Sequence, residues 1–190
     1  MDIKALIAKA ERDCAPVFAR LEENELYCTN QVLSAFHEEN VATRHFAPTT
    51  GYGYDDIGRD TLERIFARIF GAESAIVRPS IACGTAALSL CLFGLLLPGD
   101  HLLSATGAPY DTMETVIGTV GNAPGNLKEM QVSYSQVEMC DDQQKIDVQG
   151  VLSAIRPNTK VVLIQRSRGY AWRASLLPGD MEKVITAVHK

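Results

Sequence analysis

"DHLLSATGAPYDTMETVIG", residues 100–118, decides the fold class. Residues 100–106 predict a strand, and residues 111–118 predict a helix that begins with the capping box Asp111/Glu114. The same alternation continues on both sides of this stretch. Further strands are predicted at 74–80 (buried), 130–139 and 159–165, and further helices at 84–96, 147–157 and from Pro178 to Lys190. The pattern is typical of an α/β fold with a predominantly parallel sheet and helices on both faces.

The residues before this region are helical and then irregular. Apolar residues recur near helical spacing in two segments, which predicts helices at 2–23 and 25–39. A long loop is expected over 41–60. Asp60 and Glu63 form a second possible capping box, so the next helix is predicted to begin there and to end at Gly71.

Composition limits the classes of protein to be considered. The chain has 190 residues, 46% hydrophobic and 22% charged, with a formal net charge of −5. This charge argues against binding to nucleic acid or to an anionic membrane, since both need surplus Lys and Arg. Five cysteines without a CxxC pair, and no signal peptide or membrane-length apolar run, predict reduced, partly buried thiols in a cytoplasmic protein.

The segment "RPSIACGTAALSL" (78–90) contains the first candidate binding site. A predicted strand is followed by a helix that begins on Cys83, Gly84 and Thr85. Unpaired amides at a helix N-terminus favour an anion such as a phosphate, and the Thr85 hydroxyl adds a donor. The alternative is that the small residues only allow a buried helix to pack tightly.

Two further candidates follow predicted strands, at the edge where open α/β sheets bind ligands. Tyr110 could stack on a planar cofactor or simply cover the contact between helix and strand. In "QRSRGYAWR" (165–173), Arg166, Arg168 and Arg173 suit recognition of a carboxylate or phosphate. They could equally be surface arginines paired with acidic residues.

Several other kinds of site have no support. The GxGxxG and GxxxxGK[ST] patterns are absent, and the four histidines lack metal-binding or catalytic-triad spacing. No metal is expected. The acidic pairs Asp55–Asp56 and Asp141–Asp142 are better explained as turns or solvated faces than as paired catalytic carboxylates.

Taken together, four motifs resemble one family. "GYGYDDIGRDTLE", "VRPSIACGTAAL", "GAPYDT" and "VVLIQRSRGYAW" resemble the aluminium-resistance or methionine gamma-lyase branch of the Cys/Met-metabolism enzymes that use pyridoxal 5′-phosphate (PLP). The resemblance begins near residue 20 and covers about the first half of such an enzyme. It implies fold type I, the aspartate aminotransferase fold. It also implies an N-terminal helical segment (1–48), an inter-subunit cofactor loop (49–60) and the first part of the PLP-binding large domain (61–190).

The resemblance also assigns roles to residues. Cys83, Gly84 and Thr85 match the turn that binds the PLP phosphate, and Tyr110 matches the tyrosine that stacks on the ring and assists proton transfer. In a homodimer or homotetramer, the 49–60 loop would reach the neighbouring subunit's cofactor through Tyr54. The family's arginine is replaced by Asp56 here, and Arg59 would take over its contact.

Other parts of the family pattern are changed or missing. The family's Pro- and Asn-containing turn is "QRSRGY" here, where Gln165 or Arg168 would stand in. None of the seven lysines has a Ser or Thr three residues before it, as the Schiff-base lysine typically does. The resemblance therefore predicts the N-terminal fragment of a carbon–sulfur lyase acting on an amino acid, inactive alone. An aminotransferase and a non-catalytic truncated chain remain the alternatives.

Overall fold

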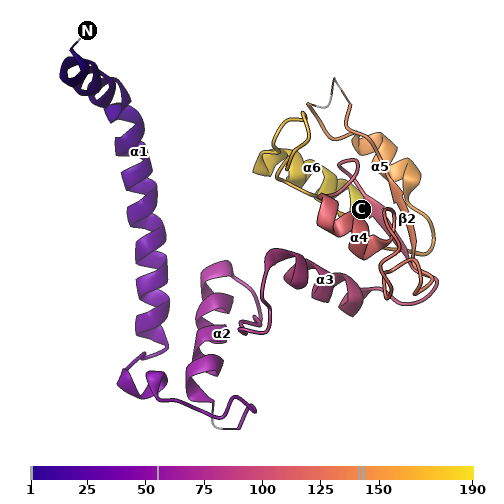
Figure 1. Ribbon diagram of the computed structural model, residues 1–190, viewed down its shortest axis with the longest axis horizontal. Helices are drawn as coiled ribbons and strands as arrows, with labels where there is room; N and C mark the ends of the chain where they lie inside the picture. The colour runs from indigo at the N-terminus through magenta and orange to yellow at the C-terminus, as the bar shows by residue number, and fades with distance from the viewer. Residues whose placement is uncertain (1, 55, 141, 143) are drawn as a thin grey trace. The chain divides into compact units, whose positions relative to one another are not determined.

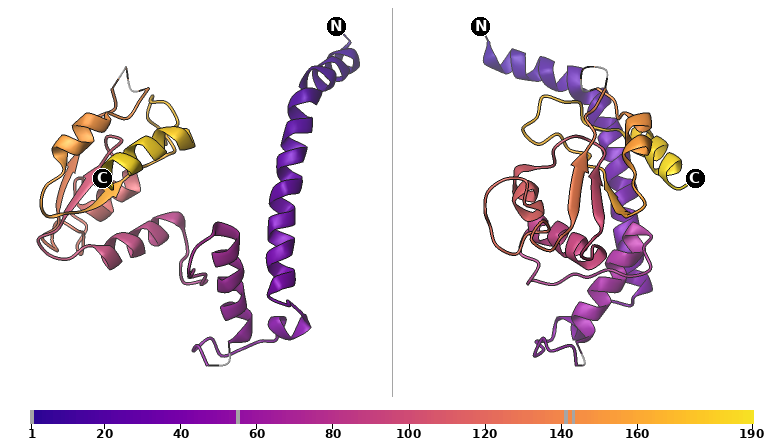
Figure 2. Two further views of the ribbon diagram at one scale, coloured as in Figure 1. Left: turned by 180° about the vertical axis from the view of Figure 1, so that it is seen from behind. Right: turned by 90° about the vertical axis from the view of Figure 1, so that its right-hand side faces the viewer.

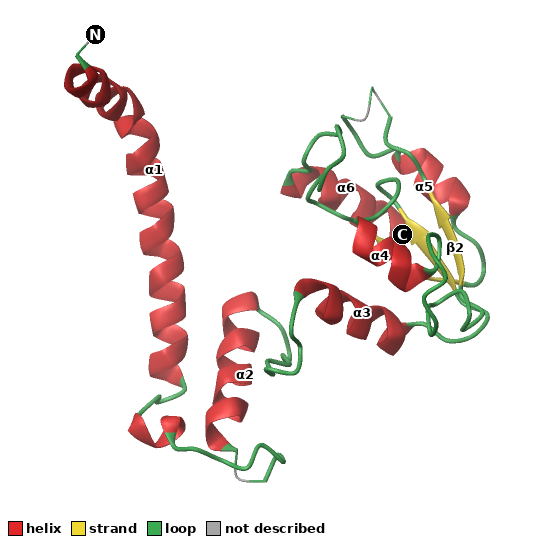
Figure 3. Cartoon of the chain, viewed as in Figure 1, coloured by secondary structure: helices red, strands yellow, loops and turns green. Residues whose placement is uncertain are grey.

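The computed structural model describes residues 2–54, 56–140, 142 and 144–190. The chain forms two compact units, residues 1–80 and 81–190, and each is described by itself. Figures 1 and 3 show the helices and strands. The first unit contains α1 (Ile3–Glu38), the 3₁₀-helix η1 (Thr43–Phe46) and α2 (Ile57–Phe70). The second contains α3 (Gly84–Leu95), β1 (His101–Ser104), α4 (Asp111–Ile117), β2 (Ser133–Gln136), α5 (Val148–Ala154), β3 (Thr159–Leu163) and α6 (Pro178–Val188).

Helix α1 is a single helix of 36 residues, so the predicted break near residue 24 is wrong. Asn24 has only a modest cost in a helix interior, and no Gly or Pro stands beside it to end the helix. Pro16 lies inside the helix and removes one backbone hydrogen bond. Figure 2 shows that the ribbon bends toward its N-terminal end.

The end of α1 is joined to α2 by an ion-pair cluster. The Glu39 carboxylate accepts hydrogen bonds from Arg64 Nε at 2.7 Å and from Arg68 Nε at 2.6 Å, and Glu38 pairs with Arg68 at 2.8 Å. The hydrogen bonds from Arg64 and Arg68 lower the pKa of Glu39. Below this cluster, Ala35 is buried in α1 and Ile65 in α2. The two helices are therefore packed together at this end.

Helix α2 begins at Ile57, three residues before the predicted N-cap Asp60. The predicted capping box is wrong because both of its carboxylates bind elsewhere. Glu63 accepts a hydrogen bond from the Val77 amide at 2.9 Å and pairs with Arg78 at 2.7 Å, while Asp60 lies 3.6 Å from Arg78. The helix ends as predicted at Gly71, which is in the left-handed conformation.

The predicted strand at 74–80 is also wrong. None of these residues belongs to a strand, and the Ile76 side chain is 75% exposed. The Val77 amide donates to the Glu63 carboxylate, so it is not available to a sheet. The short apolar run is held as a loop by side chains of α2.

The second unit is built on a parallel sheet of three strands in the order β2-β1-β3. The predicted strands at 100–106, 130–139 and 159–165 are found, each shorter than expected. The pairing of β1 with β3 skips Lys160, since His101 pairs with Thr159 and Leu102 with Val161. All four residues of the central strand β1 are buried.

Two apolar clusters meet at β1. Leu102 packs in one cluster with residues of α3 and α4, and Leu103 packs in the other with residues of α5 and α6. Because neighbouring side chains of a strand point to opposite faces, the two clusters lie on opposite faces of the sheet. The α/β class, the parallel sheet and the helices on both faces are therefore confirmed.

The four helices of this unit lie where the sequence predicts them. The capping box predicted for α4 is wrong because Tyr110, and not Asp111, is its N-cap residue. The five cysteines are free, as predicted, but all are exposed and none is partly buried. Within the part of the chain that the structure describes, no helix has the length and apolar character needed to cross a membrane.

Candidate active site

The N-terminus of α3 faces open space. An added Cβ on Gly84 would meet no atom within 4 Å, and both Cys83 and Gly84 are exposed. The Cys83 sulfur accepts a hydrogen bond from the Ala86 amide at 3.4 Å and so acts as the N-cap. The amides of Gly84 and Thr85 belong to the first turn and have no acceptor within the helix. They form a place where an anion can approach the backbone.

Thr85 connects this helix end to α4. Its hydroxyl lies 2.9 Å from the Thr112 hydroxyl, and Thr112 follows Tyr110 by two residues. The start of α3 and the start of α4 are thereby held side by side. The two sequence candidates Thr85 and Tyr110 consequently belong to one region of the second unit.

Tyr110 is also fixed from the β3 side. Its amide donates to Gln165 Oε1 at 2.7 Å, and its ring stacks on Tyr170 with 5.8 Å between the ring centroids. Gly169 has φ +56°, and a Cβ there would lie 3.0 Å from Tyr110 Cδ2, so only glycine fits easily. The neighbouring Tyr170 hydroxyl raises the pKa of Tyr110, so the Tyr110 hydroxyl keeps its proton at neutral pH. The loops after β1 and β3 thus meet at Tyr110.

The arginines after β3 have different surroundings. Arg166 and Arg168 are exposed, whereas Arg173 is 5% exposed. Arg173 donates to the carbonyls of Gln165 at 2.8 Å and Ser167 at 2.6 Å, and burial lowers its pKa. Arg173 therefore holds the loop in place, and its prediction as a ligand-binding arginine is wrong. The side chains of Arg166 and Arg168 are exposed and remain open to a ligand.

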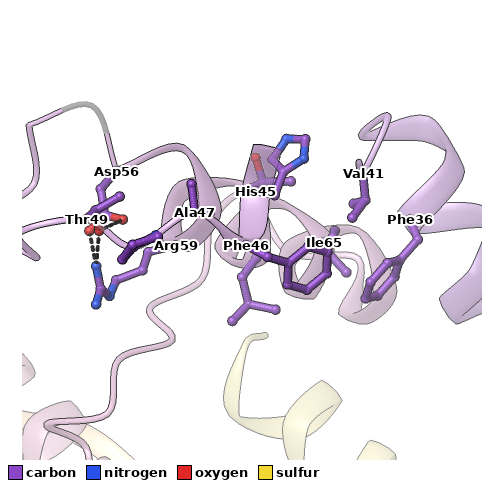
Figure 4. Close-up of a pocket in the computed structure, with 13 residues that line it drawn as sticks. Phe36, Val41, His45, Phe46, Ala47, Thr49, Asp56, Arg59 and Ile65 are labelled. Atoms are coloured by element: carbon purple, nitrogen blue, oxygen red, sulfur yellow. Dashed lines mark hydrogen bonds and ion pairs between the residues drawn. The ribbon is translucent and has the colours of Figure 1, made fainter. Parts of the chain in front are cut away.

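The first unit holds the other sequence candidates. The buried Asp56 carboxylate accepts hydrogen bonds from the Thr49 hydroxyl at 2.8 Å and from Arg59 at 2.5 Å, and Arg59 also donates to Thr49 at 2.7 Å (Figure 4). Burial acts to raise the pKa of Asp56, but the hydrogen bonds from Arg59 and Thr49 outweigh it, so that the pKa is lowered. These three residues, the loop anchor, close the base of the 49–60 loop.

The tip of this loop is open. Tyr52 and Tyr54 are 84% and 83% exposed, so neither ring packs on the unit that carries it. Behind the loop anchor lies an open pocket of 360 Å³, whose apolar part includes Phe36, Phe46 and Ile65. The loop thus presents two tyrosines from a fixed base.

We expect Asp56→Ala to loosen the loop. Removing the carboxylate leaves Arg59 and Thr49 without their shared acceptor, so chymotrypsin should cleave after Tyr52 and Tyr54 about two- to fivefold faster, the range that a partly exposed ion pair supports. Asp60→Ala is the matched control, since Asp60 only lies 3.6 Å from Arg78 at the edge of α2. Equal cleavage rates in the two variants would show that the loop anchor does not restrain the loop.

Sequence reasoning left out three residues that organise these sites. The sequence analysis did not predict a role for Thr112 or Tyr170, or the ion pair of Asp56. A signal for the last was present, because Asp56 and Arg59 have the i, i+3 spacing of a helical ion pair. Asp55 and Asp141 lie outside the described residues. Among residues 2–54, 56–140, 142 and 144–190, no cluster of three or more His, Cys, Asp or Glu side chains could hold a metal ion.

Comparison with known proteins identifies the relatives of the chain. The methionine gamma-lyase family model matches residues 3–190. The uncharacterized protein YnbB of Bacillus subtilis (strain 168) is 46% identical over 187 residues, which is 98% of this chain and 44% of YnbB.

Solved structures agree with this match. A proposed cystathionine beta-lyase involved in aluminum resistance from Listeria innocua is 43% identical, with a TM-score of 0.93 over 99% of this chain and 46% of its own. A carbon-sulfur lyase involved in aluminum resistance from Clostridium novyi NT is 39% identical, with a TM-score of 0.89 over 97% of this chain and 44% of its own. The chain spans less than half the length of these relatives, and it belongs to the methionine gamma-lyase family.

Proposed function

We propose that this chain is the N-terminal part of a PLP-dependent carbon–sulfur lyase of fold type I, which acts on a thioether amino acid of the cystathionine type. One observation carries the proposal: the open N-terminus of α3 is tied to Tyr110 through the Thr85–Thr112 contact of 2.9 Å. An anion site and an aromatic ring, held together at the carboxyl ends of parallel strands, suit a planar cofactor with a phosphate group. The names of the relatives supply the reaction class.

The residues at α3 fit the phosphate. Open space at Gly84 allows close approach to the backbone, and the amides of Gly84 and Thr85 would donate to phosphate oxygens. The dipole of this 12-residue helix adds a favourable interaction with the negative charge. Cys83 remains the N-cap through its sulfur.

Tyr110 would lie against the pyridine ring and would place a protonated hydroxyl near the reacting atoms. Gln165 holds the Tyr110 backbone, and Tyr170 covers one side of its ring, so the orientation of Tyr110 is set before a ligand binds. When bound, PLP supplies an electron sink for the charge left by loss of the substrate's α-proton. Arg166 and Arg168 would bind the substrate carboxylate through paired hydrogen bonds.

Two parts of the site would come from elsewhere. No lysine occurs in the three segments that meet at Tyr110, residues 83–85, 110–112 and 165–170. The Schiff-base lysine and the acid on the pyridine nitrogen would therefore belong to a part of the protein beyond these 190 residues. Tyr54 and Arg59 would contact the cofactor of a neighbouring subunit in a homodimer or homotetramer, with the loop anchor orienting Arg59.

The reaction is tested on the full-length protein with L-cystathionine. A carbon–sulfur lyase should release a free thiol, ammonia and a 2-oxo acid in equal amounts. Formation of a 2-oxo acid only with an added amino-group acceptor, and without thiol or ammonia, would instead establish an aminotransferase.

The phosphate site is tested on this chain with pyridoxine 5′-phosphate, which cannot form a Schiff base. Gly84→Asp places a carboxylate where the phosphate would bind, and acidic residues are well tolerated in the first turn of a helix. We expect binding of pyridoxine 5′-phosphate to weaken on the order of tenfold, with little change for pyridoxine, in a fluorescence titration.

Gly94→Asp is the control for this experiment. It adds the same charge to the same helix, about 15 Å along its axis from Gly84. Equal weakening by both substitutions, or equal effects on the binding of the two ligands, would show that the phosphate does not bind at the N-terminus of α3.

A further inference from the structure

A heptad pattern runs along α1. Two series of residues, each repeating every seven positions, follow one side of this helix. The first series consists of apolar residues of small or medium size, and the second lies between its members. The first series is Ile7, Cys14, Leu21, Cys28 and Ala35, and the second is Ile3, Ala10, Val17 and Asn24. In coiled coils these are the a and d positions, which form one stripe that faces a partner helix. We call these nine residues the α1 seam.

Only one end of the α1 seam is used within the first unit. Ala35 is 4% exposed where α1 meets α2. Ile3, Ile7, Val17 and Leu21 are 66%, 53%, 46% and 58% exposed. Burying aliphatic side chains of this size is worth about 1.5–3 kcal/mol each, so an apolar stripe of this length points to a partner.

Charge along α1 is divided between its two halves. The Lys and Arg side chains all lie before residue 21, and the acidic side chains predominate after it. The first half contains Lys4, Lys9, Arg12 and Arg20 with Glu11 and Asp13, and the second contains Glu22, Glu23, Glu25 and Glu38. An antiparallel partner with the same sequence is complementary to this pattern, whereas a parallel one brings the acidic halves together.

We propose that the α1 seam pairs with that of a second copy of this chain, antiparallel about a two-fold axis. In the register with Cys14 opposite the partner's Val17, Ile3 lies opposite the partner's Cys28. Ala10 then lies opposite the partner's Leu21. Residues 3–28 overlap, which leaves Ala35 to its contact with α2. The register leaves one polar mismatch, Asn24 opposite the partner's Ile7.

The flanking residues agree with this register. Lys4 lies beside the partner's Glu25, and Asp13 lies beside the partner's Arg20, so both flanking charge pairs are attractive. Pro16 falls on the opposite face of the helix, so its ring does not enter the seam. The pairing is isologous, because each contact occurs twice.

Cysteine cross-linking tests the register. In a chain whose five cysteines are replaced by serine, Ala10→Cys together with Leu21→Cys places a thiol opposite a thiol of the partner, whereas the two thiols of one chain are about 16 Å apart along the helix. We expect a covalent dimer to form at least about tenfold faster under mild oxidation than with Ala10→Cys and Ala19→Cys, because residue 19 lies on the outer face. Equal rates for the two variants would overturn the proposed pairing.

Charge reversal tests the partner's identity. Lys4→Glu and Glu25→Lys should each weaken dimerisation about fivefold in sedimentation equilibrium, and the double variant should restore it. Additive losses in the double variant, or a chain that stays monomeric, would show that a different surface covers the seam. Circular dichroism confirms that each variant keeps its helix. Neither experiment depends on the proposed lyase activity.

Discussion

Replacing Gly58 by alanine should lower the free energy of unfolding by about 1–3 kcal/mol, the usual cost of forcing extra atoms into a packed site. An added Cβ on Gly58 would clash with the carbonyl oxygen of His45, well inside the contact distance of the two atoms. This neighbour is backbone of η1, so it cannot move aside as the end of a side chain would. The contact between η1 and α2 needs a glycine, and urea denaturation of the purified chain measures the loss.

Gly94→Ala is the matched control. Gly94 also lies in a helix, but a Cβ there would meet no atom within 4 Å. Alanine should therefore raise the free energy of unfolding by about 0.5–1 kcal/mol, through its better helix propensity. The two identical substitutions are expected to have opposite signs. A stabilising effect at Gly58 would mean that η1 is not packed on α2 in solution.

His101→Ala should cost on the order of 3 kcal/mol, because it leaves both a cavity and unpaired polar atoms in the sheet. His101 is fully buried in the central strand. Its Nδ1 lies 2.7 Å from the Thr159 hydroxyl, and its Nε2 lies 2.8 Å from the Ser135 hydroxyl. One imidazole thus joins all three strands. His189→Ala, at the exposed end of α6, should change stability by no more than about 0.5 kcal/mol.

The same residue gives the stability of the chain a pH dependence. Burial, and then the charge of Arg156, lower the pKa of His101 from its ordinary value of 6.5. The unfolded chain therefore binds a proton at a higher pH than the folded chain does. The contribution of His101 is complete above pH 6.5 and is lost as the pH falls from 6.5 toward the lowered pKa.

The difference in free energy of unfolding between the natural chain and His101→Ala should accordingly become smaller as the pH falls below 6.5. Urea denaturation of both proteins at several pH values measures it. A gap that stays constant from neutral pH to pH 5 would mean that the imidazole is not buried in its neutral form.

The second unit could be predicted well because two of its three strands are short apolar runs between turn residues. Residues 100–106 and 159–165 are of this kind, and their alternation with helices leaves few arrangements other than a parallel sheet. The run at 74–80 has the same composition, yet it is a loop. Its hydrogen-bond partner is the Glu63 carboxylate, and a pattern of apolar residues contains no information about such a tertiary contact.

The candidate site likewise has parts that the sequence predicts and parts that it does not. Thr85 and Tyr110 could be found because strand ends and helix starts are visible in the sequence, and these places are where ligands bind. The residues that fix them, Thr112 and Gln165, act across 27 and 55 residues of chain. Ordinary threonine and glutamine side chains carry no signal of such contacts, so only the folded chain reveals them.

The strand order has a consequence for the time course of folding. Both neighbours of β1 come later in the chain, and the contact of His101 with Thr159 spans 58 residues. A growing polypeptide must therefore keep β1 unpaired on one edge until β3 has been synthesised. Such long-range pairing slows folding relative to helical domains of similar size. During protein synthesis, the apolar Leu103, whose cluster includes residues of α5 and α6, would be exposed for that interval, and this is when a chaperone would have its main effect.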